Sequence, residues 1–85
     1  MKEFSYTLTA EHGLHGRPAA ALAQAARAYE STVIVSLGAG SADATRLIAL
    51  MTLCAKRGDT VTVTVTGPDE EQAARALEQL FRETM

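Results

Sequence analysis

The stretch DTVTVTVTG, residues 59–67, alternates threonine and valine without interruption. Successive side chains of a β-strand point to opposite faces, so this pattern predicts a strand with one buried and one solvent-exposed face. Val61, Val63 and Val65 would then face a core, and the threonines between them would face outward. Such a strand needs a covering layer on its valine side only. The stretch therefore predicts a sheet with one open face.

Three further strands follow from similar patterns. Phe4, Tyr6 and Leu8 alternate with hydroxyl-bearing side chains, which predicts an N-terminal strand. The run TVIVSL, residues 32–37, is rich in β-branched side chains and alternates again. The residues GAG that follow are typical of a turn, and they leave room for a short strand near residues 40–42.

Three other segments have helical sequences. Pro18 suits a first helical turn, and the alanine-rich stretch after it predicts a helix to about Glu30. The segment DATRLIALMTLCAK, residues 43–56, predicts a short second helix with Asp43 as its N-cap. The segment PDEEQAARALEQLFRE, residues 68–83, begins with acidic residues, which favour the positive end of a helix dipole, and predicts a third helix.

This order of elements, β-α-β-β-α-β-α, predicts an α+β fold. Strands with one wet face, covered by helices on the other, form a two-layer open-faced β-sandwich. We expect a four-stranded antiparallel sheet covered by three helices. A chain of 85 residues is long enough for one small core, so we expect a single domain over residues 1–85.

Composition narrows the possible functions. The net charge is -2 and no basic cluster is interleaved with aromatic residues, so nucleic acid is not an expected partner. No apolar run approaches the roughly 20 residues that cross a bilayer, and the N-terminus lacks the apolar core of a signal peptide. We therefore expect a cytoplasmic protein without membrane insertion. One cysteine and two separated histidines make no recognisable ligand set, so we expect neither a metal nor another cofactor.

The stretch EHGLHGRPAAALAQAAR, residues 11–27, carries the candidate chemistry. Backbone N–H groups at a helix start lack intrahelical acceptors, and together with the helix dipole they attract anions such as phosphate. Imidazole can act as a nucleophile near neutral pH, so His15 can attack phosphorus, and the Arg17 guanidinium can bind phosphoryl oxygens. His15 and Arg17 are the candidate catalytic residues, and Gly16, Arg17 and Pro18 the candidate phosphate-binding ones. The alternative is an ordinary surface histidine beside a solvated arginine.

The residues GLHGRPAA, 13–20, resemble the active-site signature of HPr, the phosphocarrier family of the bacterial phosphoenolpyruvate:sugar phosphotransferase system. The similarity covers nearly all 85 residues. It implies the open-faced β-sandwich and a stoichiometric carrier, monomeric and not an enzyme. In such a carrier His15 accepts a phosphoryl group from phospho-enzyme I through Nδ1 and donates it to an EIIA component. The resemblance also makes Arg17 the phosphate-assisting arginine and Pro18 the helix-initiating proline.

A docking surface is expected on the second helix. Its apolar side chains spread over an arc of about 220°, wider than one core-facing stripe requires. We expect Leu50 and Leu53 in the core, and Leu47, Ile48 and Met51 in an exposed apolar patch that binds partners transiently. The alternative is that the small domain packs this helix on two sides.

A basic edge on the first helix extends this surface. Arg17, Gln24 and Arg27 have helical spacing that places them on one stripe, which suits acidic partner surfaces. Taken alone, such a stripe is more often a solvated face. The resemblance implies that both helices meet the donor and the acceptor.

The sequence departs from the family pattern at several positions. Arg46 stands where many HPr proteins carry a serine that HPr kinase phosphorylates, so we expect that control to be absent. Thr45 would replace the serine only weakly, and Arg46 would favour anionic partners. Gly16 stands where alanine or threonine is more common. Cys54 replaces a common glycine, and we expect an inert, packed thiol there. We expect no proton or phosphate role for His12.

A second function stays open at this point. The same apolar patch could serve a regulatory binding module in which phosphorylation labels the partner-binding state. Sugar transport, a nitrogen-related branch and a dihydroxyacetone kinase branch are all compatible with the sequence.

Overall fold

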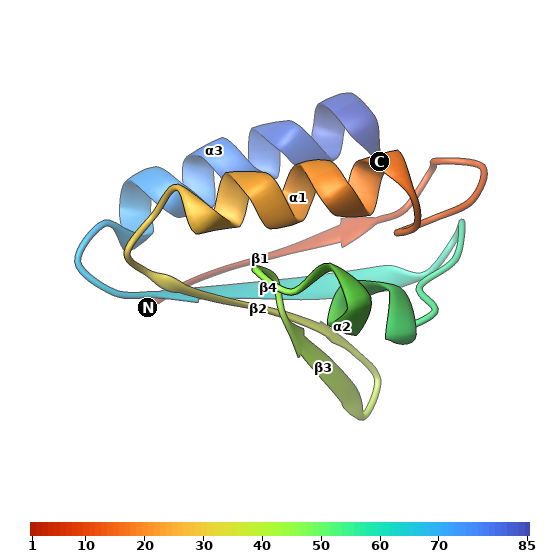
Figure 1. Ribbon diagram of the computed structural model, residues 1–85, viewed down its shortest axis with the longest axis horizontal. Helices are drawn as coiled ribbons and strands as arrows, with labels where there is room; N and C mark the ends of the chain where they lie inside the picture. Colours follow the sequence, from red (N-terminus) through yellow and green to blue (C-terminus); the bar gives the residue numbers. More distant parts are fainter.

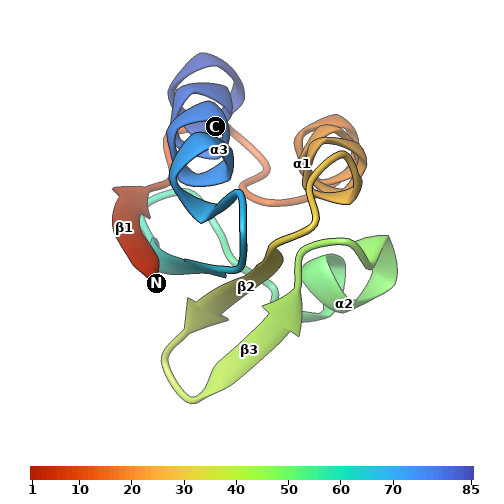
Figure 2. The ribbon, with the colours of Figure 1, turned by 90° about the vertical axis from the view of Figure 1, so that its left-hand side faces the viewer.

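The structure is a computed structural model that describes residues 1–85, and it contains the predicted order of elements (Figure 1). The elements are β1 (Lys2–Thr7), α1 (Arg17–Arg27), β2 (Thr32–Leu37), β3 (Gly40–Asp43), α2 (Leu47–Thr52), β4 (Thr60–Thr66) and α3 (Glu70–Thr84). The four strands form one antiparallel sheet in the order β1-β4-β2-β3. All three helices lie on one face of this sheet, and Figure 2 shows the other face open. The predicted α+β open-faced sandwich is confirmed.

The predicted two faces of β4, one of valines and one of threonines, are confirmed. Val61, Val63 and Val65 are fully buried under the helices. The threonines between them lie on the open face, where the Thr7 and Thr60 hydroxyls of β1 and β4 are hydrogen-bonded at 2.8 Å. Because β4 pairs with β1 on one side and β2 on the other, it is one of the two inner strands of the sheet.

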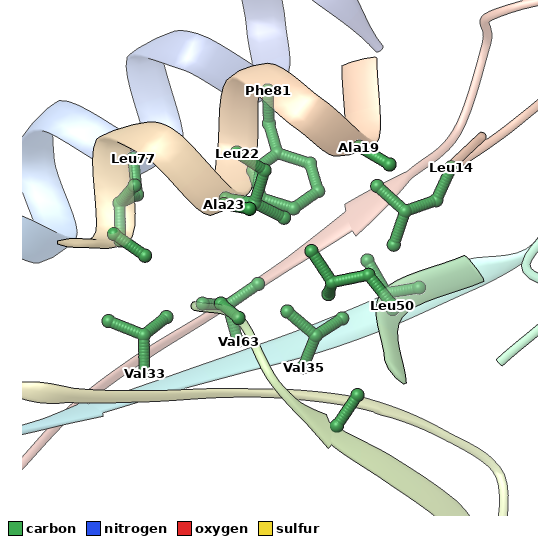
Figure 3. Close-up of a cluster of buried hydrophobic side chains, with 14 of the residues drawn as sticks. Leu14, Ala19, Leu22, Ala23, Val33, Val35, Leu50, Val63, Leu77 and Phe81 are labelled. Carbon is green, nitrogen blue, oxygen red and sulfur yellow. The ribbon is translucent and has the colours of Figure 1, made fainter. Parts of the chain in front are cut away.

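One continuous hydrophobic core lies between the sheet and the helices (Figure 3). The buried residues of α1 are mostly small, and they allow the helix backbone to approach its neighbours closely. From α3, the Phe81 ring packs edge-on against Phe4 of β1, with 5.7 Å between ring centroids. No helix is long and apolar enough to span a bilayer.

The second helix is shorter than predicted, and Asp43 is not its N-cap. Asp43 ends β3, and its Oδ1 accepts hydrogen bonds from the Thr45 N–H at 2.9 Å and the Thr45 hydroxyl at 2.7 Å. These bonds close a tight turn, because an aspartate side chain can compete with helical backbone bonding. Arg46 is extended, at φ -112° and ψ 104°, and the helix begins only at Leu47.

The first helix also ends early, at Arg27 instead of about Glu30. The N–H groups of Glu30 and Ser31 donate to the Asp69 carboxylate at 2.9 Å each, and the Ser31 hydroxyl donates to it as well. These bonds tie the connection between α1 and β2 to the residue that precedes α3. The amides of residues 30 and 31 are therefore used outside the helix.

Cys54 is exposed, so the expectation of a packed thiol is wrong. It is also the one non-glycine residue with a positive φ, 56°. It lies two residues after the end of α2, where the chain turns away toward β4. A left-handed residue just after a helix is usually glycine, because a Cβ is crowded in that conformation.

The Asp69 bonds predict a loss of stability in acid. The Ser31 hydroxyl, and then the Glu30 N–H, hold the pKa of Asp69 below its ordinary value of 3.8. A carboxyl with a lowered folded pKa stabilises the fold above its unfolded pKa, and this contribution is lost as pH falls through the folded pKa. We expect the free energy of unfolding of Ser31→Ala to fall less steeply than that of the wild type below about pH 4.

Urea denaturation at a series of pH values measures this difference. The pKa values of Asp43 and Glu70 are also lowered, but neither carboxylate is bonded to Ser31. Their titration is common to both proteins and cancels in the comparison. Parallel curves for wild type and variant would contradict the assignment to Asp69.

The backbone at Cys54 predicts a stabilising substitution. Cys54→Gly removes the Cβ from a left-handed position, a gain partly offset by the larger entropy of an unfolded glycine chain. We expect an increase of up to about 1 kcal/mol in the free energy of unfolding, measured by urea denaturation. Cys54→Ala retains the Cβ and is the matched control, so an equal gain from alanine would refute the backbone explanation.

Candidate functional site

His15 is exposed at the start of α1, in the connection from β1 that we call the active-site loop, residues 8–16. The residue before it, Leu14, is buried in the core. The residue after it, Gly16, is the N-cap of α1, with φ 60° and ψ -127°. This conformation is one that glycine adopts far more readily than other residues. Glycine at position 16 thus permits the turn that places His15 in solvent beside the helix start.

Three backbone N–H groups at this helix start have no acceptor within the chain. They belong to Gly16, Arg17 and Ala19, whereas Pro18 has no N–H; the first helical bond runs from the Ala20 N–H to the Gly16 oxygen at 3.0 Å. A serine or aspartate N-cap would bind some of these groups with its side chain, but glycine has none. The first turn also contains no acidic residue. The helix start is therefore open to an anion.

The structure brings together the predicted site residues Gly16, Arg17 and Pro18 beside His15. Sequence reasoning missed Ala19, although a proline in the second helical position leaves the third amide as the next free donor. The amide of His15 itself is unavailable, because it donates to the Gly13 oxygen at 3.0 Å. The side chain of Arg17 is exposed, so its guanidinium is free to reach a group on His15.

The active-site loop is held by distant parts of the chain. The Ala10 N–H donates to the Met85 oxygen at 3.0 Å, and the side chain of Met85 is itself buried. The Leu14 N–H donates to the Ala55 oxygen at 3.0 Å. His12 is exposed on the same loop, and its side chain makes no hydrogen bond. Sequence analysis did not predict the Met85 and Ala55 contacts, which join residues far apart in the chain.

The apolar patch on α2 is smaller than predicted. Ile48 is 71% exposed, but Leu47 and Met51 are half-buried and pack against the core. Leu50 is buried as expected, whereas Leu53 is only half-buried. The reason is that α2 contacts both α1 and β3, so the alternative of packing on two sides is partly correct.

The predicted basic edge is exposed, but one of its members is a structural contact. Arg17 and Gln24 are exposed on α1 without side-chain partners. The Nε of Arg27 donates to the Thr45 oxygen at 2.9 Å and so joins the end of α1 to the turn before α2. Arg46 is exposed at the start of α2.

Thr45 and Asp43 form a small polar turn beside Arg46. The Thr45 hydroxyl and then its N–H hold the pKa of Asp43 below its ordinary value, with a smaller contribution from the Arg46 charge. The hydroxyl of Thr45 is engaged in this bond and half-buried. Its geometry is that of a turn-forming side chain.

An exposed histidine beside an open helix start forms a surface site that can accept an anion, on an open-faced β-sandwich. A family model described as the PTS HPr component phosphorylation site matches residues 2–83. The chain belongs to the HPr family of phosphocarrier proteins of the phosphotransferase system.

The similarity to individual family members covers most of each chain. The phosphocarrier protein HPr of Haemophilus influenzae is 40% identical over 74 residues, which is 87% of both chains. A solved structure of HPr from Thermoanaerobacter tengcongensis has a TM-score of 0.93 at 32% identity and covers 98% of this chain and 93% of its own. A dimer structure of HPr from the same organism has a TM-score of 0.78 at 32% identity, over 98% and 95% of the two chains.

The Arg27 bond predicts a role in stability. Arg27→Ala removes the donor to the Thr45 oxygen, and we expect a loss of about 0.5–1.5 kcal/mol in the free energy of unfolding. Gln24→Ala, an exposed change on the same helix, is the matched control and should be nearly neutral. Urea denaturation compares the two variants, and equal stabilities would show that the bond contributes nothing.

Proposed function

We propose that His15 accepts a phosphoryl group from phospho-enzyme I and donates it to an EIIA component. The observation that carries this proposal is the exposed imidazole next to three unpartnered N–H groups at the start of α1. Membership of the HPr family, whose model is described by its phosphorylation site, supports the same role. The chain acts as a single carrier domain and holds the group between two proteins instead of releasing a product.

Transfer at this site is a substitution at phosphorus. A ring nitrogen of His15, Nδ1 by the family resemblance, attacks the phosphorus atom; the N–P bond forms as the bond between phosphorus and the donor breaks. The group passes to EIIA by the reverse exchange. The Arg17 guanidinium and the free amides of Gly16, Arg17 and Ala19 stabilise negative charge on the phosphoryl oxygens. These donors bind the group most strongly while it passes between the two proteins, so they lower the barrier without holding the group on the carrier.

The partners would dock on the surface around His15. Ile48 offers an exposed apolar side chain on α2, and Leu47 and Met51 offer their exposed edges. Arg17, Gln24, Arg27 and Arg46 supply a polar and basic margin that fits acidic partner surfaces. All of these residues and His15 belong to one chain, so a monomer is sufficient for the cycle. We place this cycle in the cytoplasm, where no cofactor or metal is needed on the carrier itself.

The proposal predicts a covalent change that depends on one residue. Incubation with phosphoenolpyruvate, magnesium and enzyme I should add one acid-labile phosphoryl group, detected by intact-protein mass spectrometry. His15→Ala should remain unmodified, because it lacks the acceptor nitrogen. Arg17→Ala should be modified at least about tenfold more slowly, which corresponds to about 1.4 kcal/mol of lost transition-state stabilisation.

His12→Ala is the matched control, since it removes the other exposed imidazole of the same loop. This variant should be modified as fast as the wild type. No mass change in the wild type, or a change that survives in His15→Ala, would refute the assignment of His15.

A further inference from the structure

Gly13 lies two residues before His15, and its surroundings exclude any side chain. It is buried, with φ 65°, in the left-handed region that favours glycine. A Cβ at this position would stand 2.2 Å from the Ala55 oxygen and 2.7 Å from the Cα of Lys56. Both atoms belong to the backbone, so no side-chain rotation could relieve the clash. The active-site loop therefore lies directly against the 55–56 segment, which follows α2.

The next residue, Leu14, binds the loop to the same 55–56 segment. The Leu14 N–H donates to the Ala55 oxygen at 3.0 Å, and the Leu14 side chain points into the core in Figure 3. One carbonyl oxygen thus accepts the bond from Leu14 and also limits how much volume residue 13 can have. In Figure 1 the loop after β1 and the segment before β4 lie at the same end of the molecule.

A backbone hydrogen bond couples the position of Gly13 to that of His15. The His15 N–H donates to the Gly13 oxygen at 3.0 Å, which closes a tight turn of three residues centred on Leu14. The free amides that would bind the phosphoryl group begin one residue later, at Gly16. A shift of Gly13 away from the 55–56 segment would therefore move the imidazole relative to these amides.

We propose that Gly13 is a positioning residue for His15. Its missing side chain lets the loop close onto the 55–56 segment, and this contact sets the place of the imidazole at the start of α1. The inference rests on the proposed phosphoryl transfer at His15 and extends it to a buried residue that lies against residues 55 and 56 of the same chain. Misplacing a reacting group by about 1 Å can cost about a hundredfold in rate.

The docking residues give this role a specific kinetic signature. Ile48 on α2 and Gln24 on α1 lie on elements that Gly13 does not belong to, and Arg46 lies directly before α2. Gly13→Ala should therefore leave the concentration of carrier needed for half-maximal transfer nearly unchanged. The maximal rate should fall about ten- to a hundredfold. A variant that was merely less stable should show wild-type values of both the half-maximal concentration and the maximal rate when it is measured at a temperature where it is folded.

The experiment compares Gly13→Ala with Gly38→Ala. Gly38 has a similar φ of 59°, lies between β2 and β3, and has no atom within 4 Å of an added Cβ. Gly38→Ala thus places a Cβ at a similar positive φ without the clash at the 55–56 segment. Transfer from phosphoenolpyruvate through enzyme I is measured against carrier concentration, at a temperature where urea denaturation shows each protein to be folded. Gly38→Ala should retain the wild-type rate.

A second measurement, by NMR, does not depend on phosphoryl transfer. Long-range proton–nitrogen NMR spectra of the His15 ring, recorded in the free proteins over a pH series, should differ between wild type and Gly13→Ala. They should agree between wild type and Gly38→Ala. If the wild type accepted no phosphoryl group, the proposed function would fail while these spectra still tested the positioning. Wild-type rates and wild-type His15 spectra in folded Gly13→Ala would overturn the inference.

A backbone variant covers the case in which Gly13→Ala does not fold. Replacing Leu14 by its α-hydroxy acid turns the amide between residues 13 and 14 into an ester. This change removes the N–H that donates to the Ala55 oxygen and keeps every side chain. It should lower the maximal rate and shift the His15 ring signals in the same way. Unchanged rates and spectra in this variant would equally overturn the role of the contact.

Discussion

The burial of Leu14 beside an exposed His15 is the constraint on which the site depends. Leu14 is 1% exposed, and the next residue stands in solvent. A buried side chain fixes its own backbone, so the neighbouring imidazole is presented from a rigid support although the loop has no regular secondary structure. The loop needs few contacts of its own, because the core beneath α1 supplies the rigidity.

The open helix start follows from the way α1 is packed. Its buried face consists of Leu22 and alanines, so the helix packs closely against α3 and α2. Its N-cap is a glycine, which leaves the first amides without a side-chain acceptor. The fold thus holds a set of donors in a fixed direction, and an anion arriving there meets them without reorganisation.

Much of the architecture could be predicted from periodicity, because each strand and helix carries its own pattern. The alternation of Val61, Val63 and Val65 appears directly in the buried face of β4. Failures occurred where a side chain bonds to the backbone of another segment or of a turn. Asp43 looks like a helix N-cap but bonds to Thr45, and Asp69 takes the amides that would have extended α1. Such competing bonds depend on which groups the fold brings within reach, and local patterns do not contain that information.

The sequence by itself determined the kind of site: a histidine, a glycine N-cap, an arginine and a proline in the order that opens a helix toward an anion. These are properties of four consecutive residues, 15–18, and local backbone chemistry is enough to specify them. Only the tertiary structure decided where that site is held. The contacts of Gly13 and Leu14 with the 55–56 segment, and of Ala10 with Met85, join residues more than forty positions apart. Their distances follow from the packing of the whole sheet and helix layer, because contacts between remote segments exist only after the chain has folded.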